Sequence, residues 1–163
     1  MMFGFNAAEV FEIAIAIEEN GKKFYEQAQG LVDDLAVKKL FAELAVQEVE
    51  HKKKFESLKA QLPAEASTPT TWDPDNKLSD YIRMMADQHV FVSDEDLNTR
   101  LAQIKSTKDA LKLAVEFEKD SVIFFLSMRE AAEGKKGGEL IGLLVKEEQE
   151  HLRRLSLELR RLT

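Results

Sequence analysis

Hydrophobic residues recur every three to four positions along four long stretches of the chain, with polar residues between them. This spacing predicts helices that each bury one face. The first stretch begins at Asn6, whose distance from Glu9 fits a capping box, and the second ends at Pro63, because proline stops a helix. Gly134 and the glycines after it predict a loop before the last helix. The expected helices span residues 6 to about 30, 35 to 62, 107 to the loop at 134, and 139 to 162.

The stretch from 63 to 106 has a different composition, with all three prolines of the chain and several serines and threonines. Short helices are expected around Leu78 to Met85 and from Ser93 onwards, where a serine can cap a helix. A long connection between two helical hairpins is typical of a four-helix bundle with parallel neighbours. We therefore expect one all-α domain over residues 1–163, with hairpins 6–62 and 107–162 joined by the connection 63–106.

Two copies of the pattern Glu-x-x-His lie within the second and fourth expected helices, at Glu48–His51 and Glu148–His151. Residues three apart on a helix share a face, so each glutamate and its histidine can point at one spot. A single copy is more often part of a solvated face. A carboxylate and an imidazole directed into a bundle core are costly unless something compensates them, and a cation would do so.

The two hairpins align without a gap when the chain is shifted by 100 residues, which indicates a duplicated unit. The shift places Glu48 on Glu148 and the two histidines on each other. It also places Glu18 on Glu118, and each of these glutamates has apolar and small neighbours on its helix face. The candidate metal ligands are therefore Glu18, Glu48, His51, Glu118, Glu148 and His151. One glutamate from each of two helices and a Glu-x-x-His from each of the other two is typical of di-iron and di-manganese bundles.

Four carboxylates balance the charge of two divalent cations. Oxygen and imidazole ligands without thiolate suit iron or manganese, and zinc less selectively. A pair of such metals can hold O2 or a peroxide between them, and two Fe(II) ions can deliver two electrons together. The alternative is a metal-free bundle in which these side chains form a buried polar network. That network would need several desolvated carboxylates with raised pKa values.

Composition excludes several classes of partner and cofactor. A formal net charge of −7 argues against a nucleic-acid partner and against an anionic membrane surface. The absence of cysteine excludes disulfides, thiolate zinc sites and iron–sulfur clusters. No stretch of membrane-spanning length lacks a charge, and the N-terminus has no basic region ahead of an apolar run, so a cytoplasmic protein is expected. His89 has no counterpart in the other half and is expected at the surface or in the connection, not as a ligand.

The six candidate ligands resemble those of the rubrerythrin branch of the ferritin-like superfamily. The resemblance covers both hairpins. It implies that Glu48 and Glu148 bridge two metals, with Glu18 and Glu118 as terminal ligands and one histidine for each metal. It also implies that Tyr25, seven residues after Glu18, lies near the metals as a catalytic residue, and that the chain forms a homodimer.

Two departures from this family are visible. Ser121 stands where rubrerythrins usually carry a further glutamate, which takes part in a redox-linked metal shift. The chain also lacks the cysteine-ligated rubredoxin domain, so electrons would come from a separate donor protein. The resemblance implies a di-iron oxidoreductase that reduces hydrogen peroxide or O2. A ferroxidase or other iron-handling protein, and a metal-stabilised helical interaction module without enzymatic activity, remain as alternatives.

Overall fold

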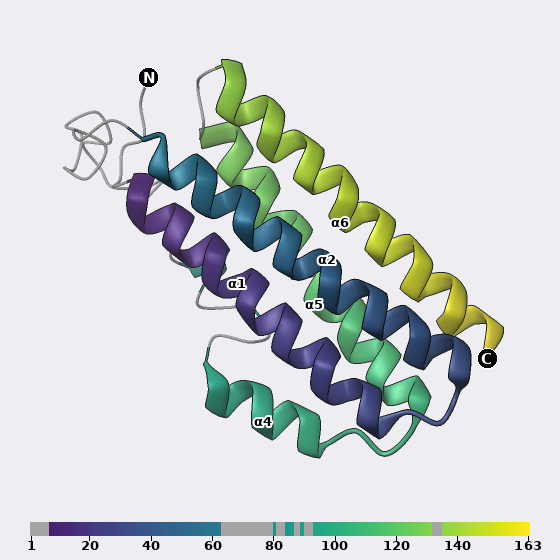
Figure 1. The fold of residues 1–163 in the computed structure, drawn as a ribbon. Helices are drawn as coiled ribbons and strands as arrows, with labels where there is room; N and C mark the ends of the chain where they lie inside the picture. The colour runs from purple at the N-terminus through teal and green to yellow at the C-terminus, as the bar shows by residue number, and fades with distance from the viewer. Residues whose placement is uncertain (1–6, 63–79, 81–83, 87–88, 90–92, 132–134) are drawn as a thin grey trace.

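The computed structural model describes residues 7–62, 80, 84–86, 89, 93–131 and 135–163. Four long helices and two short ones make up most of this part, and it contains no strand (Figure 1). The long helices are α1 (Ala7–Ala28), α2 (Leu35–Ala60), α5 (Thr107–Ala131) and α6 (Lys135–Arg161). The short ones are η1 (Gln29–Leu31) and α4 (Asp94–Ala102). The all-α prediction is confirmed.

The helices pack as two hairpins. Helix α1 packs mainly against α2, and α5 mainly against α6, while smaller contacts join α1 to α5 and α2 to α6. Helices α2 and α5 run in the same direction, so the chain between them crosses the length of the bundle (Figure 1). Helix α4 belongs to this crossover and packs against α1. This arrangement is the four-helix bundle with a long crossover that the hydrophobic pattern predicts.

Serine caps begin two of the helices, and the cap at Ser93 confirms the prediction. Ser93 Oγ accepts a hydrogen bond from the Asp96 backbone amide at 3.2 Å, and Asp96 accepts one in return from the Ser93 amide at 3.1 Å. Ser106 Oγ accepts from the Asp109 amide at 3.1 Å at the start of α5. These bonds satisfy amides that a helix leaves without internal partners. The predicted cap at Asn6 lies outside the described residues.

The last helix begins at Lys135, so the predicted start near Glu139 is wrong. Gly137 and Gly138 lie inside the helix. Glycine lowers helix stability by about 1 kcal/mol relative to alanine but does not prevent the helical conformation, so a glycine pair near an end is tolerated. The short helix expected near Leu78 lies largely outside the described residues, although 84–86 are helical.

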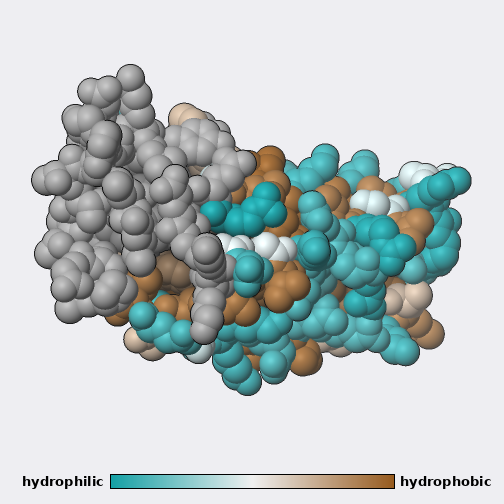
Figure 2. Space-filling model, turned by 90° about the horizontal axis from the view of Figure 1, so that it is seen from above, coloured by the Kyte–Doolittle hydropathy of each residue, from teal (hydrophilic) through white to brown (hydrophobic). Residues whose placement is uncertain are grey.

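Aromatic side chains fill much of the bundle interior. The rings of Phe24, Tyr25 and Phe41 pack with centroids 5.1 to 6.0 Å apart, and those of Phe55 and Phe125 lie 4.9 Å apart. Hydrophilic residues predominate over the described part of the face in Figure 2, with hydrophobic ones between them. Among the described helices, none combines the length and apolarity that a membrane crossing requires.

Candidate metal centre

Each of the four long helices places one glutamate in a single layer of the bundle. Glu18, Glu48, Glu118 and Glu148 are at most 1% exposed. A buried apolar residue lies seven positions before and seven positions after each of them, which is about two helical turns. These neighbours are Phe11 and Tyr25, Phe41 and Phe55, Leu111 and Phe125, and Ile141 and Leu155. The carboxylates therefore form one polar layer between two apolar layers.

The two histidines lie beside this layer with their rings stacked, at a centroid distance of 5.2 Å and an interplanar angle of 10°. His51 Nδ1 contacts Glu148 and is 3.6 Å from Glu18 Oε2. His151 Nδ1 lies 3.3 Å from Glu148 Oε2 and 3.4 Å from Glu118 Oε1. Both Nδ1 atoms therefore point into the carboxylate cluster, as the Glu-x-x-His spacing predicts.

Two overlapping sets of four of these side chains have ligand atoms no more than 4.8 Å from one another, and so does a smaller group of His51, Glu148 and His151. One set is Glu18, Glu48, His51 and Glu148, and the other is Glu48, Glu118, Glu148 and His151. The sets share Glu48 and Glu148 and differ in one glutamate and one histidine. Two carboxylates shared between two sets of four ligands suit a pair of adjacent cations with bridging ligands.

Many polar atoms of this cluster lack a hydrogen-bond partner among the described residues. These buried atoms are both carboxylate oxygens of Glu18 and Glu148, one oxygen of Glu48 and of Glu118, and Nδ1 of each histidine. A self-sufficient polar network would pair these atoms, because leaving such groups unpaired is costly. The orphaned oxygen and nitrogen atoms instead fit divalent cations, with iron and manganese matching the donor set.

Burial sets the ionisation of the cluster. Burial is the main influence that raises the pKa values of Glu18, Glu48 and Glu118 well above the usual range, and neighbouring carboxylates raise them further. Burial also acts to raise the pKa of Glu148, but the contacts with His51 and His151 outweigh it, so that pKa lies below its usual value. Without a cation the cluster thus retains protons, and cation binding would release them.

Tyr25 lies at the edge of the cluster, where its hydroxyl donates a hydrogen bond to Glu118. The tyrosine is fully buried. Burial, and next the negative charge of Glu118, raise the pKa of Tyr25 well above its usual value, so the hydroxyl keeps its proton at neutral pH. Tyr25 therefore lies near the candidate metal ligands, as the resemblance to rubrerythrins implies. Its catalytic role stays a prediction.

Glu147 is a residue of this region that the sequence reasoning missed. His51 Nε2 lies 2.6 Å from Glu147 Oε2, so the ring contacts the cluster through one nitrogen and Glu147 through the other. The shift of 100 residues pairs Glu147 with Gln47, so a search for repeated acids cannot detect it. Glu50 and Glu150, which do repeat, are exposed. The available signal was the position of Glu147 one turn before His151 on the ligand-bearing helix.

Ser121 and His89 form a second buried pair, one turn along α5 from Glu118. His89 is 4% exposed, so its expected surface position is wrong, although it does lie in the connection. Its Nε2 is 3.2 Å from Ser121 Oγ, which donates in turn to the Phe117 carbonyl at 3.0 Å. Burial lowers the pKa of His89 to about 4, so the ring is neutral at pH 7. His89 is not part of either ligand set.

A surface cavity of about 480 Å³ reaches the two imidazoles between α2 and α6. Its lining consists of Gln47, Glu50, His51, Lys54, Glu147, Glu150, His151 and Arg154. The apolar layers flank the cluster along the bundle axis, while this cavity borders the two histidines from the side.

The fold and site together define a helical bundle with a buried carboxylate and imidazole cluster. A crystal structure of a protein from Thermotoga maritima, assigned as a candidate ferritin-like diiron-carboxylate protein, has a similar fold. It superposes with a TM-score of 0.75 at 24% identity, over 100% of both chains. The rubrerythrin family model matches residues 9–159, and the chain belongs to this family. No curated protein matches it.

Proposed function

We propose that the protein is a di-iron oxidoreductase that reduces hydrogen peroxide or O2 with electrons from a separate donor protein. The observation that carries this proposal is the pair of overlapping ligand sets that share Glu48 and Glu148. Eight buried polar atoms of these sets lack a hydrogen-bond partner among the described residues. Because the sequence has no cysteine, it has no thiolate-ligated centre of its own to feed electrons to the site.

The proposal assigns Glu18 and His51 to one metal, Glu118 and His151 to the other, and the shared glutamates to both. When bound, two Fe(II) ions would supply the two electrons that convert one hydrogen peroxide and two protons into two waters. The apolar residues seven positions away on each helix exclude bulk water from the cluster along the bundle axis. This dry surrounding strengthens electrostatic interactions within the site.

Tyr25 is the proposed source of a positioned proton. Its buried hydroxyl keeps its proton at neutral pH and points at Glu118, a terminal ligand of the proposed centre. A hydroxyl held at this place can donate a hydrogen bond, or a proton, to an oxygen atom beside the carboxylate. General acids positioned in this way typically contribute about 10²–10⁴-fold to a rate.

The test is to load the protein with Fe(II) without oxygen, add hydrogen peroxide, and follow iron oxidation and turnover with an electron donor. We expect two irons per chain, rapid oxidation and repeated turnover. Glu148→Gln, which removes a shared ligand, should abolish all three. Glu150→Gln on the same helix should not, because Glu150 is exposed and pairs with Arg153. Absent or slow oxidation of the loaded wild-type protein would refute the proposal.

Iron oxidation without a dedicated donor is the second candidate function. The cavity that leads from the surface to both histidines favours it, because iron entering by that route could be oxidised and passed on. Repeated uptake of Fe(II) with O2, without a reductant and with accumulation of ferric mineral, would support this function. Less than about one metal per chain, with melting unchanged by a chelator, would instead support a helical interaction module.

A further inference from the structure

The two histidines of the cluster differ in the residue placed beside the side of the ring that faces away from the carboxylates. His51 Nε2 is 2.6 Å from Glu147 on α6. Under the shift of 100 residues, Gln47 would stand in the same relation to His151, and Gln47 also lines the cavity. A carboxylate therefore faces one histidine, and a neutral amide occupies the corresponding position of the other half. The difference lies in the sequence itself and does not depend on a bound metal.

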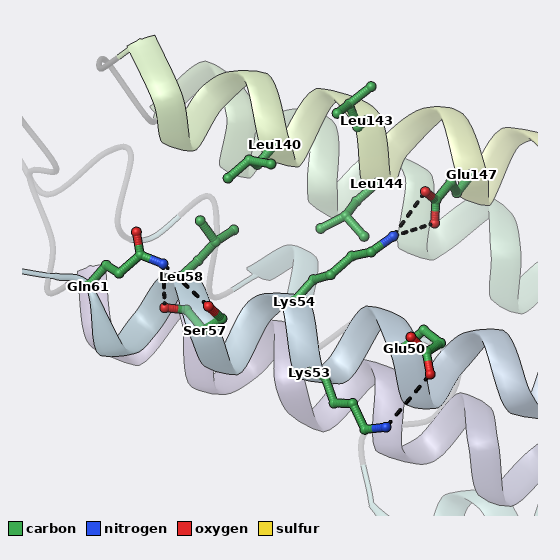
Figure 3. A pocket seen from close by; sticks show the side chains of 10 residues that line it. All are labelled: Glu50, Lys53, Lys54, Ser57, Leu58, Gln61, Leu140, Leu143, Leu144 and Glu147. Atoms are coloured by element: carbon green, nitrogen blue, oxygen red, sulfur yellow. Dashed lines mark hydrogen bonds and ion pairs between the residues drawn. The ribbon is translucent and has the colours of Figure 1, made fainter.

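Lys54 fixes Glu147 in place. Its amine lies 3.0 Å from both carboxylate oxygens of Glu147. Figure 3 shows the Lys54 side chain reaching from α2 across to Glu147 on α6. The corresponding residue of the other half, Arg154, pairs with Glu43. The series of contacts Lys54–Glu147–His51 is therefore found on one side of the pseudo-symmetric site. Among the described residues it has no copy on the other side.

The contacts among Lys54, Glu147 and His51 determine which ring nitrogen of His51 can bind a metal. A carboxylate clamped by an ammonium group is ionised and can only accept hydrogen bonds, so His51 Nε2 carries the proton. Nδ1, which faces Glu18 and Glu148, is then the ring nitrogen whose proton a cation would replace. A carboxylate that accepts the outer N–H of a ligating histidine fixes its tautomer and increases its basicity.

We infer that Glu147 is a positioning residue that acts through His51 to make the metal position of Glu18 and His51 bind more tightly than that of Glu118 and His151. The inference rests on the proposed metal centre, but not on the reaction proposed for it. The competing explanation is that Lys54 and Glu147 only tie α2 to α6. In that case loss of Glu147 would lower the stability of the metal-free protein and leave the two metal positions equally affected.

The experiment compares the metal affinities of wild-type protein, Glu147→Gln and Glu150→Gln. Both variants remove one negative charge from the lining of the same cavity, but Glu150 pairs with Arg153 and not with an imidazole. Metal-free protein is titrated with Co²⁺ in competition with a chelator, and bound cobalt is counted by elemental analysis. We expect two bound ions in the wild type and in Glu150→Gln. In Glu147→Gln one of the two should bind about 10–100-fold more weakly.

A second readout separates positioning from simple stabilisation. In Zn²⁺-loaded protein, the nitrogen-bound ring proton of His51 should be visible by ¹⁵N-correlated NMR in the wild type and in Glu150→Gln. Its signal should shift or be lost in Glu147→Gln, with the ring signals of His151 unchanged. Lys54→Met, which keeps the carboxylate but removes its clamp, should weaken the same ion by a smaller factor. If Glu147→Gln is less helical than the wild type, the Lys54→Met variant tests the inference in its place.

The outcomes separate the inference from the proposed function. Two ions bound equally tightly by Glu147→Gln and the wild type would overturn the inference alone. Equal weakening of both ions, or the same loss in Glu150→Gln, would overturn it as well. A wild-type protein that binds no metal would overturn both the inference and the proposed function. A protein that shows the expected binding pattern but no oxidation by peroxide or O2 would overturn the proposed function alone.

Discussion

Gly21 allows the sharpest test of how tightly the candidate centre is packed. It lies in α1, one turn after Glu18. A Cβ atom at this position would lie 2.7 Å from the Phe117 ring and 3.1 Å from the carboxyl carbon of Glu48. Gly142 in α6 is the matched control, since a Cβ atom there would meet Arg129 at 3.5 Å, an ordinary van der Waals contact. Replacing each glycine by alanine therefore changes the same helix propensity in two different surroundings.

The magnitudes follow from these distances. Alanine in place of glycine within a helix contributes about 1 kcal/mol. Gly142→Ala should retain most of this gain. At Gly21 the Phe117 ring cannot move away freely, because the rings of Phe24 and His89 lie 6.4 and 5.3 Å from it. Overpacking of this kind costs about 1–3 kcal/mol. Gly21→Ala should therefore be neutral to about 2 kcal/mol destabilising, and about 1–3 kcal/mol less stable than Gly142→Ala.

The assay is urea unfolding of the metal-free proteins followed by circular dichroism, with thermal melting as a check at about 2–4 °C per kcal/mol. Metal loading is a second readout, because the new methyl group presses on Glu48, a residue of both ligand sets. Gly21→Ala should bind cations more weakly, while Gly142→Ala should bind them as the wild type does. If Gly21→Ala is as stable as Gly142→Ala and binds metal normally, the packing around Glu48 is looser than described.

Three further predictions concern pH, the tyrosine and the metals. Burial lowers the pKa of His89 from 6.5 to about 4. Between these pH values the unfolded chain therefore binds more protons than the folded protein does. The free energy of unfolding should decrease by up to about 3 kcal/mol as the pH falls through this window. His89→Gln should flatten that part of the stability profile, and an unchanged profile would contradict the assignment. Tyr25→Phe should still bind two cations but reduce peroxide roughly 10²-fold more slowly, and equal rates would exclude the tyrosine as a proton donor. Free Fe(II) at 100 times the dissociation constant should stabilise the wild type in anaerobic melting by about 2.7 kcal/mol for each occupied site, or about 5 kcal/mol for two sites, whereas Glu148→Ala should show no such gain.

Helical periodicity and the repeat were enough to predict the bundle and the six clustered side chains. The periodicity works because the four long helices are amphipathic, and the cluster is detectable because charged residues at Glu18 and Glu118 interrupt apolar faces. Glu147 escaped detection because it lies on the partly exposed side of α6, where acids are common. The burial of His89 was also missed, since it depends on how the crossover packs and a single histidine has no periodic signal.

The connectivity of the ligand sets has a consequence for cooperativity. Packing is extensive within each hairpin and smaller between them, yet each ligand set draws residues from both hairpins. A cation held by Glu18 and Glu148 would join positions 130 residues apart in the chain. Because this site exists only when both hairpins are folded, the binding energy of the cation would stabilise the two hairpins as one unit. We expect the halves of the metal-free protein to open in hydrogen exchange with separate protection levels. Once loaded, they should open together as one unit.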